Sequence, residues 1–454
     1  MQTQRDHVHA HQFQMGRMSS ALVLGDPTSA ESPSHRSMIG LIVGAVLAVL
    51  IVACFAVFGW LVPGGSSSWK TKGAIIVEKE TGNRYVYLNG LLRPALNLTS
   101  AMLIEGAQAN IQLTSRNSLK GVPHGAPIGI SGAPQTVPAP SALHTSGWLA
   151  CLSGSAGGPA DGIGLNLTPN NSPRPTQLDR DKFVLVTAGG DEYLVWRNHR
   201  FKITDPAVPV ALGVTNATPI PAPLEWVEIL TPDQALSVPK IPGQGQAGPA
   251  VAGHPYQVGQ VFYQSGGSGD QLFVLRKDGL AAVDKTAYLL LQSASGTPVA
   301  LNAADVASAP RSADKSLTGL LPELGSAKFA DLGNQVLCQW QEPASAKSIN
   351  FAVVTTDRAN AALRADGTPR VNVQPGTGMV VYPIPLPVNA STAPPYLVSD
   401  EGISYSMPND ETMSSLKFPS SSKVPFPRGL LARIKSGPVL SLQAIAATEE
   451  GTTS

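Results

Sequence analysis

Residues 84–94 read Arg-Tyr-Val-Tyr-Leu-Asn-Gly-Leu-Leu-Arg-Pro. Two runs of β-prone residues flank the pair Asn89-Gly90, a dipeptide that two-residue hairpin turns favour. The stretch therefore predicts a β-hairpin. A lone hairpin is only marginally stable in water, so this one needs further strands or a helix to pack against. The run Ala74-Ile-Ile-Val-Glu78 just before it supplies one such strand.

The same pattern returns three times along the chain. Its further copies are 192–203, 271–283 and 396–407. Asp278-Gly279 is a second favoured turn pair, and Glu401-Gly402 is a weaker one. Chance recurrence of hairpin patterns is the alternative to true repetition.

A longer extension favours true repetition for the second and fourth copies. In both, a proline-rich stretch is followed by an apolar run, which we expect to form a short helix at 224–230 and at 430–434. Between the copies, 350–356 and 378–382 read as buried core strands, and 126–141 reads as an extended segment rich in Pro and Ala. The pattern indicates a β core with four small repeats.

Composition points the same way. The chain holds 44 Gly and 39 Pro in 454 residues, and only 14% of its residues are charged. Pro costs about 3 kcal/mol in a helix interior and Gly about 1 kcal/mol, so such a chain favours short strands joined by turns. The formal net charge is +1 with no basic block, which excludes an ordinary nucleic-acid-binding surface.

Residues 38–62 contain no charged side chain. As a helix, this run spans about 37 Å at 1.5 Å per residue, more than the ~30 Å hydrocarbon core of a bilayer. Trp60 stands near one end, as interfacial aromatics do. A cleaved signal peptide is the alternative, but its apolar core would be shorter and its leader would be shorter than 37 residues. We therefore expect a single uncleaved transmembrane helix.

The orientation of that helix is not given by the flanking charges. Only Arg36 lies close before it, whereas Lys70, Lys72 and Lys79 follow. The positive-inside rule then leans against export of the C-terminal domain, although the rule is weak for long translocated domains.

The chain has three cysteines. Cys54 lies in the apolar run, which leaves Cys151 and Cys338 for the rest of the chain. Two cysteines are the smallest number that can form a disulfide, and two separate buried thiols are the alternative. No Cys/His spacing typical of a zinc site is present.

Several stretches, in this order, resemble the EccB family of membrane components of type VII (ESX) secretion systems. They are 11–27, 73–87 with 92–101, 122–134, 148–151 and 371–380. The first resembles a short cytoplasmic helix before the membrane span, the second a first repeat, and the last two core segments. The chain departs from the family pattern at Gln12, Gln14, Ser19 and Leu24, where arginines are more usual; this leaves open how the helix meets partners and lipid.

The resemblance implies a fold and a setting. The fold class is mainly β with some α: an N-terminal transmembrane helix, and an extracytoplasmic central β core with four small peripheral repeat modules. The core would hold a disulfide between Cys151 and Cys338. The N-terminus would be cytoplasmic and the large domain periplasmic, on the cell inner membrane. The implied partners are EccC, EccD, EccE and the mycosin protease, with further copies of the chain and the lipid bilayer.

Together these features divide the chain into ten segments. They are a cytoplasmic segment (1–37), the transmembrane helix (38–62), a linker (63–72), repeat 1 (73–110), a core segment (111–180), repeat 2 (181–240), repeat 3 (241–300), a second core segment (301–390), repeat 4 (391–445) and a tail (446–454).

We predict no catalytic or metal site, and the sequence leaves any cofactor-binding residues open. The phosphate loop G-x-x-x-x-G-K-[ST] is absent, so ATP is expected only by assignment from the family. Other candidates have plainer explanations: 154–157 and 264–270 as turn-rich loops, His7, His9 and His11 as solvated side chains of a tail, and Asp191/Glu192 and Asp400/Glu401 as surface turn residues.

The sequence therefore predicts a structural subunit of a secretion complex whose exported domain associates with itself and its neighbours around a conduit. One alternative is a module that binds cell-wall glycan through aromatic side chains, namely Tyr85, Tyr193, Trp196, Tyr396 and Tyr405, although the same side chains would equally fill the cores of the repeats. Another is an ATPase, as sometimes assigned to the family.

Overall fold

The computed structural model describes residues 4–25, 34–61, 67–154, 162–169, 175–266, 269–319 and 321–451. The chain divides into two compact units. The first comprises residues 1–70, 77–82 and 112–122, and the second comprises residues 71–76, 83–111 and 123–454.

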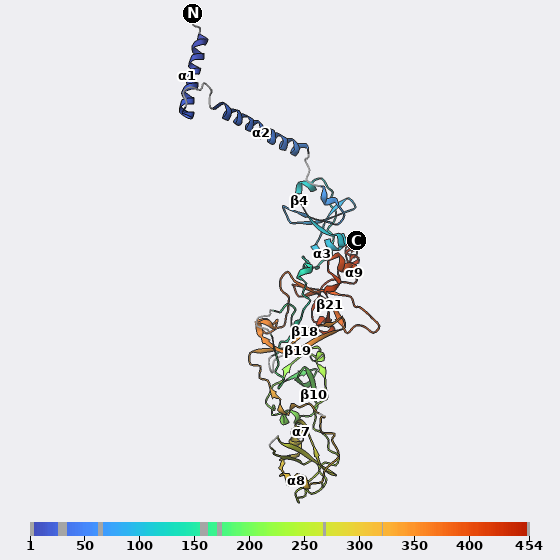
Figure 1. Cartoon of the computed structure of the whole chain (residues 1–454). Helices are drawn as coiled ribbons and strands as arrows, with labels where there is room; N and C mark the ends of the chain where they lie inside the picture. Colours follow the sequence, from blue (N-terminus) through green and yellow to red (C-terminus); the bar gives the residue numbers. More distant parts are fainter. Residues whose placement is uncertain are drawn as a thin grey trace. The chain divides into compact units, whose positions relative to one another are not determined.

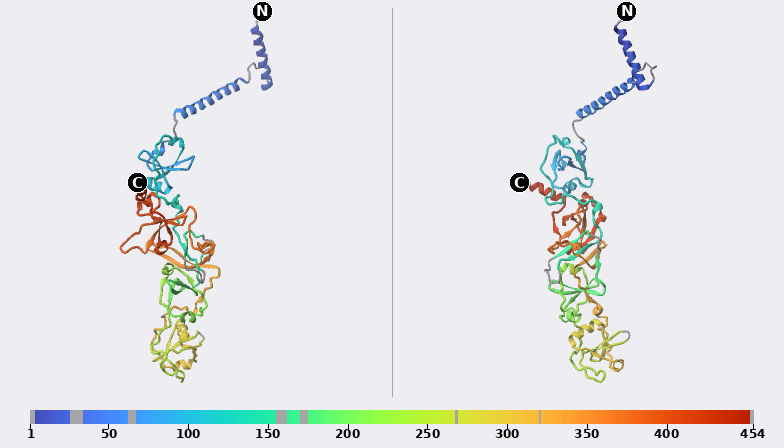
Figure 2. Two further views of the ribbon diagram at one scale, coloured as in Figure 1. Left: turned by 180° about the vertical axis from the view of Figure 1, so that it is seen from behind. Right: turned by 90° about the vertical axis from the view of Figure 1, so that its left-hand side faces the viewer.

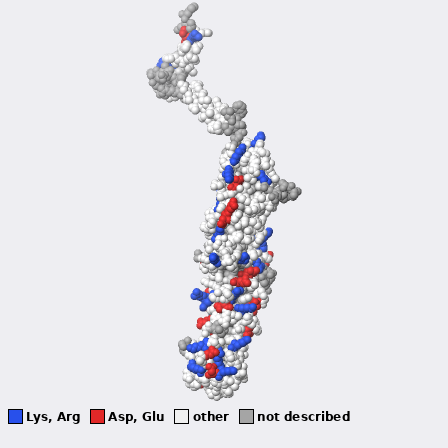
Figure 3. Space-filling view, turned by 90° about the vertical axis from the view of Figure 1, so that its right-hand side faces the viewer, with Lys and Arg blue, Asp and Glu red and all other residues white. Residues whose placement is uncertain are grey.

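The first unit contains two long helices, α1 (Gln4–Leu24) and α2 (Ser34–Leu61), drawn in blue in Figure 1. From Ser37 to Gly59, α2 has a mean hydropathy of 3.1 and buries none of its side chains in the protein. In Figure 3 this stretch carries neither blue nor red side chains. Its 28 residues span about 42 Å, enough to cross a bilayer. The predicted transmembrane segment falls on α2, except that Val62 lies outside the described residues.

The second unit is built around a central sheet with the strand order β20-β6-β5-β18-β19-β7. Strands β18 and β19 form a long antiparallel hairpin, and β18 also pairs with β5. The strand bounds are β5 (Trp148–Leu152), β6 (Ile163–Asn166), β7 (Thr176–Gln177), β18 (Gln335–Ser345), β19 (Ser348–Asp357) and β20 (Val371–Asn372).

Strand β5 is buried along its whole length because both of its faces are covered. Its alternate residues Trp148, Ala150 and Leu152 join one hydrophobic cluster, while Leu149 and Cys151 join another. This period of two is what an extended strand imposes.

Four further sheets share one order of elements. In the second, third and fourth repeats, three antiparallel strands are followed by a helix and then by a short strand that pairs parallel to the first. In the first repeat, β4 takes the same place beside β1. The predicted fold class, a β core with four small repeats and an N-terminal apolar helix, is confirmed.

The elements of the first two repeats are β1 (Ala74–Glu78), β2 (Arg84–Leu88), β3 (Leu91–Pro94), α3 (Leu98–Glu105), β4 (Asn110–Thr114) and α4 (Arg116–Leu119), then β8 (Lys182–Ala188), β9 (Asp191–Trp196), β10 (His199–Ile203), α5 (Ala207–Ala211), β11 (Ile220–Pro221), α6 (Leu224–Ile229) and β12 (Thr231–Pro232).

The elements of the last two are β13 (Val261–Gln264), β14 (Gln271–Arg276), β15 (Gly279–Ala282), α7 (Lys285–Ser295), β16 (Val299–Ala300) and α8 (Ala303–Ser308), then β21 (Gly378–Ile384), β22 (Tyr396–Ser399), β23 (Ile403–Ser406), α9 (Asp410–Ser415), β24 (Lys423–Pro427), α10 (Arg428–Leu431) and β25 (Lys435–Ser436). Strand β17 (Lys328–Phe329) pairs with β8, and α11 (Leu442–Gly451) ends the described chain.

The hairpin turns fall on the residues expected from the sequence in two repeats and on other residues in the other two. Asn89 and Gly90 both have positive φ, 51° and 83°, as their turn type requires, and Gly402 closes a three-residue turn at φ 70°. In the second repeat the two turn residues with positive φ are Arg197 and Asn198, and an arginine does not predict this conformation.

Asp278-Gly279 was the wrong pair for the third repeat. Gly279 is the first residue of β15, so Asp278 precedes the strand and is not half of a Gly-containing turn. A Cβ on Gly279 would lie 2.2 Å from the carbonyl oxygen of Pro310. The glycine is needed because another backbone segment passes there.

Two strands belong to repeats, not to the predicted core segments. Strand β21 is buried as expected, but it pairs with β22 and β24 in the sheet of the fourth repeat. Strand β4, mostly beyond residue 110, lies in the sheet of the first repeat. The remaining boundaries of the ten-segment division stay predictions.

Shared hydrophobic clusters link the parts of the second unit. One cluster joins the central sheet to the second and fourth repeats, another joins the second repeat to the third, and a third joins the first repeat to the fourth. Figure 2 shows these segments, far apart in sequence, next to one another in both views. The repeats are thus packed together and are not strung on free linkers.

Candidate functional site

The disulfide of the central sheet joins Cys151 of β5 to Cys338 of β18. The two residues are direct partners in the antiparallel ladder, and both are fully buried. The bond cross-links the two inner strands of the sheet across 187 residues of sequence. Cys54, the third cysteine, lies exposed on α2 as a free thiol.

A chain of buried hydrogen bonds leads from this sheet to the second repeat. Trp148 Nε1 donates to Gln341 Oε1 (2.9 Å), and Gln341 Nε2 donates to Gln339 Oε1 (2.8 Å). Gln339 Nε2 then donates to the carbonyl oxygen of Trp226 on α6 (2.7 Å), whose indole Nε1 donates back to the Ala150 carbonyl (2.9 Å). All four side chains are fully buried, so each bond satisfies a group that water cannot reach.

Sequence reasoning missed this network. Its signal was available in Leu337-Cys-Gln-Trp-Gln341, where two glutamines stand two residues apart in an otherwise buried-looking strand. That spacing puts both amides on one face of the strand, where buried polar groups need partners from each other or from a neighbour.

The corresponding helices of the second and fourth repeats, α6 and α10, meet on the same side of the network. Arg433, just after α10, donates from Nη2 to both carboxylate oxygens of Glu225 on α6, at 2.9 and 3.1 Å. Burial alone would raise the pKa of Glu225. Hydrogen bonds from its own backbone N–H and from Arg433 outweigh that effect and hold its pKa below the ordinary value. A Cβ on Gly429 would approach Glu225 Cγ to 2.9 Å, so glycine permits this close contact.

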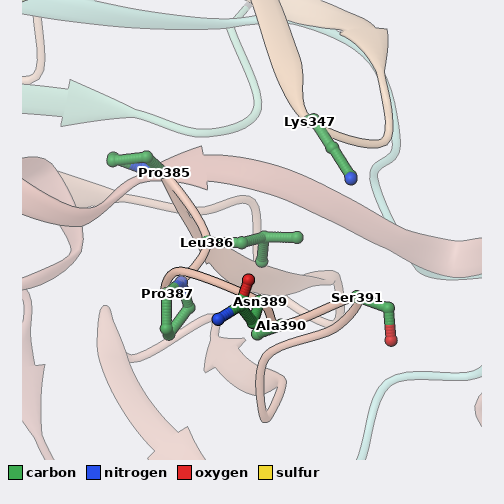
Figure 4. A pocket seen from close by; sticks show the side chains of 7 residues that line it. All are labelled: Lys347, Pro385, Leu386, Pro387, Asn389, Ala390 and Ser391. Carbon is green, nitrogen blue, oxygen red and sulfur yellow. The ribbon is translucent and has the colours of Figure 1, made fainter.

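A concavity of about 510 Å³ lies between the loop after β21 and the tip of the β18–β19 hairpin. Figure 4 shows its lining, in which Leu386 and Lys347 face one another across the opening. Tyr382 ties the two segments together by donating to the Ala346 carbonyl (2.7 Å). Lys347 is the one titratable side chain in the lining, so the concavity offers no acid–base pair.

The carboxylate pairs named from the sequence do not converge on a cleft. Asp191 begins β9 and pairs with Lys202 on β10, at 2.7 Å between partly exposed side chains. Asp400 lies in the turn after β22 and accepts a hydrogen bond from the Gly376 N–H. Asp400 is thus a surface turn residue, as predicted, whereas Asp191 is the first residue of a strand and the turn prediction for it was wrong.

The aromatic side chains proposed to stack on glycan are mostly interior. Tyr405 is 1% exposed, Trp196 6% and Tyr193 9%, because they fill the cores of their repeats. Tyr85 and Tyr396 are half-buried. Three of the five thus have no ring face to offer a sugar, and this corrects the expectation on which the glycan-binding alternative stood.

The remaining candidates carry no site in the described chain. His7, His9 and His11 lie exposed on α1. Within the described residues, no group of three His, Cys, Asp or Glu side chains is placed to hold a metal ion. Ser155, Ala156 and Gly157 of the first predicted loop, and Gly267 and Ser268 of the second, lie outside the described residues.

Comparison with known proteins gives this architecture a family. The family described as "Type VII secretion system ESX-1, transport TM domain B", the EccB family, matches residues 1–454. The chain belongs to this family. An EccB relative from Mycobacterium tuberculosis, named "ESX-1 secretion system ATPase EccB1", is 27% identical over 97% of this chain and 94% of its own.

Two solved structures share the EccB fold. The structure of the periplasmic assembly from the ESX-5 inner membrane complex has a TM-score of 0.63 at 24% identity and covers 84% of this chain and 97% of that one. The EccB3 dimer from the ESX-3 core complex has a TM-score of 0.59 at 25% identity, covering 82% and 99%. The resemblance stated from the sequence is confirmed.

Proposed function

We propose that this chain is a membrane-anchored structural subunit of a type VII secretion complex. The family match over residues 1–454 carries the proposal. Helix α2 anchors the chain in the inner membrane, with α1 on the cytoplasmic side and the disulfide-bonded second unit on the periplasmic side. A disulfide persists in such an oxidising compartment, which supports this orientation.

The architecture suits a scaffold because its repeats share hydrophobic clusters with each other and with the central sheet. A rigid domain of this kind can hold neighbouring subunits at fixed distances. One relative was solved as a dimer, and another within an inner membrane assembly. We infer that this chain binds further copies of itself, and that EccC, EccD, EccE and the mycosin protease are its other partners.

The first test is purification of the tagged full chain from its native membrane in mild detergent, followed by mass spectrometry and particle sizing. We expect EccC and EccD to co-purify in a megadalton particle. An unrelated tagged protein with one membrane span controls for micelle effects. A monomer or dimer recovered alone under gentle conditions would contradict the scaffold function.

A second prediction concerns the ATPase activity named for relatives such as EccB1. This sequence lacks the glycine-rich loop and lysine that cradle nucleotide phosphates in the commonest ATPases. We therefore expect purified chain, freed of EccC, to release no phosphate from ATP above a buffer blank. Turnover that stays with the chain through successive chromatography steps would assign it an activity that this proposal leaves out.

A further inference from the structure

The Lys and Arg residues that follow α2 take no part in the hydrophobic clusters that join the repeats. Residues 67–125 carry seven Lys and Arg against three Glu, which leaves 25 against 28 for the rest of the chain. Lys and Arg are usually more frequent on the cytoplasmic side of a membrane helix, so cations on the exported side run against this tendency. Their presence close to the membrane segment therefore calls for a partner of opposite charge.

Part of this charge gathers on a defined surface of the first unit. The turn 77–82 lies beside the segment 112–122, because the Lys79 N–H donates to the Thr114 carbonyl at 3.0 Å. Arg116 reinforces the contact: its Nε lies 2.6 Å from Glu78 Oε1, and its backbone N–H donates to Glu80.

These contacts engage both acidic side chains of the surface, Glu78 with the Arg116 guanidinium and Glu80 with a backbone N–H. Lys79 and Lys120 are exposed, and neither side chain takes part in an ion pair within the described residues. Between them in the sequence, Leu113 leaves 65% of its surface in water. Exposed lysines and an exposed apolar side chain on neighbouring segments are the combination that suits the boundary between headgroups and acyl chains.

The chain itself keeps part of this surface near a bilayer. Lys70, which is exposed, follows Leu61, the last residue of α2, by only nine positions. At no more than about 3.5 Å per residue, Lys70 lies within roughly 30 Å of the end of the helix. Anionic headgroups attract cations over about a Debye length beyond their surface, and a tether this short lets the lysine reach that distance.

We propose that Lys70, Lys79 and Lys120, together with Leu113, form a lipid-binding surface for anionic headgroups of the membrane in which α2 is anchored. The inference rests on the proposed anchoring. It gives these three lysines a function, which is to hold the lipid-binding surface against the bilayer.

The test uses the full chain with Cys54→Ser and Asn117→Cys, so that a bimane fluorophore can be attached beside the surface. Labelled protein is reconstituted in vesicles of phosphatidylcholine, with or without phosphatidylglycerol, that contain a lipid spin-labelled on its headgroup as the quencher. Asn117 is exposed, so the label displaces no core side chain. Resistance to alkaline carbonate extraction, measured on the same vesicles, reports anchoring by α2 separately.

We expect quenching to be stronger with phosphatidylglycerol and to fall as salt rises. Each lysine near an anionic surface contributes roughly fivefold, so the triple variant Lys70→Gln, Lys79→Gln, Lys120→Gln should lower the ratio of docked to undocked surface about a hundredfold. Replacing the same lysines by arginine should retain the effect. A matched variant, Lys240→Gln, Lys277→Gln, Lys347→Gln, removes three exposed lysines elsewhere and should change nothing.

Two results would overturn the proposal. One is equal quenching in both lipid mixtures by protein that resists carbonate. The other is release of the surface by inorganic phosphate at an ionic strength where chloride has no effect, which would assign the lysines to free phosphate instead of lipid. Protein lost to carbonate would instead refute anchoring by α2, and the lipid-binding surface would fall with it.

Discussion

Replacing both Cys151 and Cys338 by alanine is expected to lower the free energy of unfolding of the second unit by roughly 5 kcal/mol. The disulfide closes a loop across 187 residues, and a closed loop of that length restricts the unfolded chain strongly. Urea denaturation of the full chain in detergent, followed by tryptophan fluorescence, measures the difference. A reducing agent should have the same effect on the native protein and no effect on the double variant.

The single variants provide the control for this prediction. Because either substitution breaks the same bond, Cys151→Ala and Cys338→Ala should each destabilise about as much as the double variant. Cys54→Ser, on α2, should leave the denaturation midpoint in place. Additive losses from the two single variants would mean that the thiols contribute by separate packing and not by a cross-link.

Trp226→Ala is expected to destabilise the domain by about 3–5 kcal/mol, the usual cost of removing a large buried aromatic side chain. The indole is fully buried in the cluster that joins the central sheet to two repeats. Its removal leaves a cavity and takes away the indole N–H that donates to the Ala150 carbonyl. The change should also loosen α6, which hydrogen exchange of the backbone amides of residues 224–229 would detect.

Trp340→Ala is the matched control, because Trp340 lies on β18 but is only half-buried and donates at the surface to Glu342. Its loss should be clearly smaller. Equal destabilisation by the two variants would show that Trp226 contributes no more to the junction than a half-buried side chain of the central sheet does.

The local features of this fold could be predicted from the sequence better than its long-range contacts. Asn89-Gly90 predicted its turn because both residues tolerate positive φ, and the apolar run of α2 was readable from length and composition alone. Arg197 adopts the same turn conformation without such a signal, since the flanking strands impose it.

The departures all depend on contacts between distant segments. The burial of Met379 and Val380 was predictable from their apolar side chains, but the sheet they join depends on β24, more than forty residues later. Gly279 resembled a turn residue because the approach of Pro310 is not visible in the local pattern. Tyr405 resembled a surface platform for the same reason: its ring is enclosed by residues from two repeats.

The pairing of β5 with β18 also fixes an order of events as the chain is made. Synthesis runs from the N-terminus, so β5 is complete while β18 and the residues between them are still to come. Until then the fully apolar run Trp148–Leu152 lacks its inner neighbour, and an unpaired strand edge invites aggregation. The second and third repeats, whose own strands lie close together in sequence, can fold during this interval. Closure of the central sheet then comes late, and formation of its disulfide marks a chain in which both middle modules have already been synthesised.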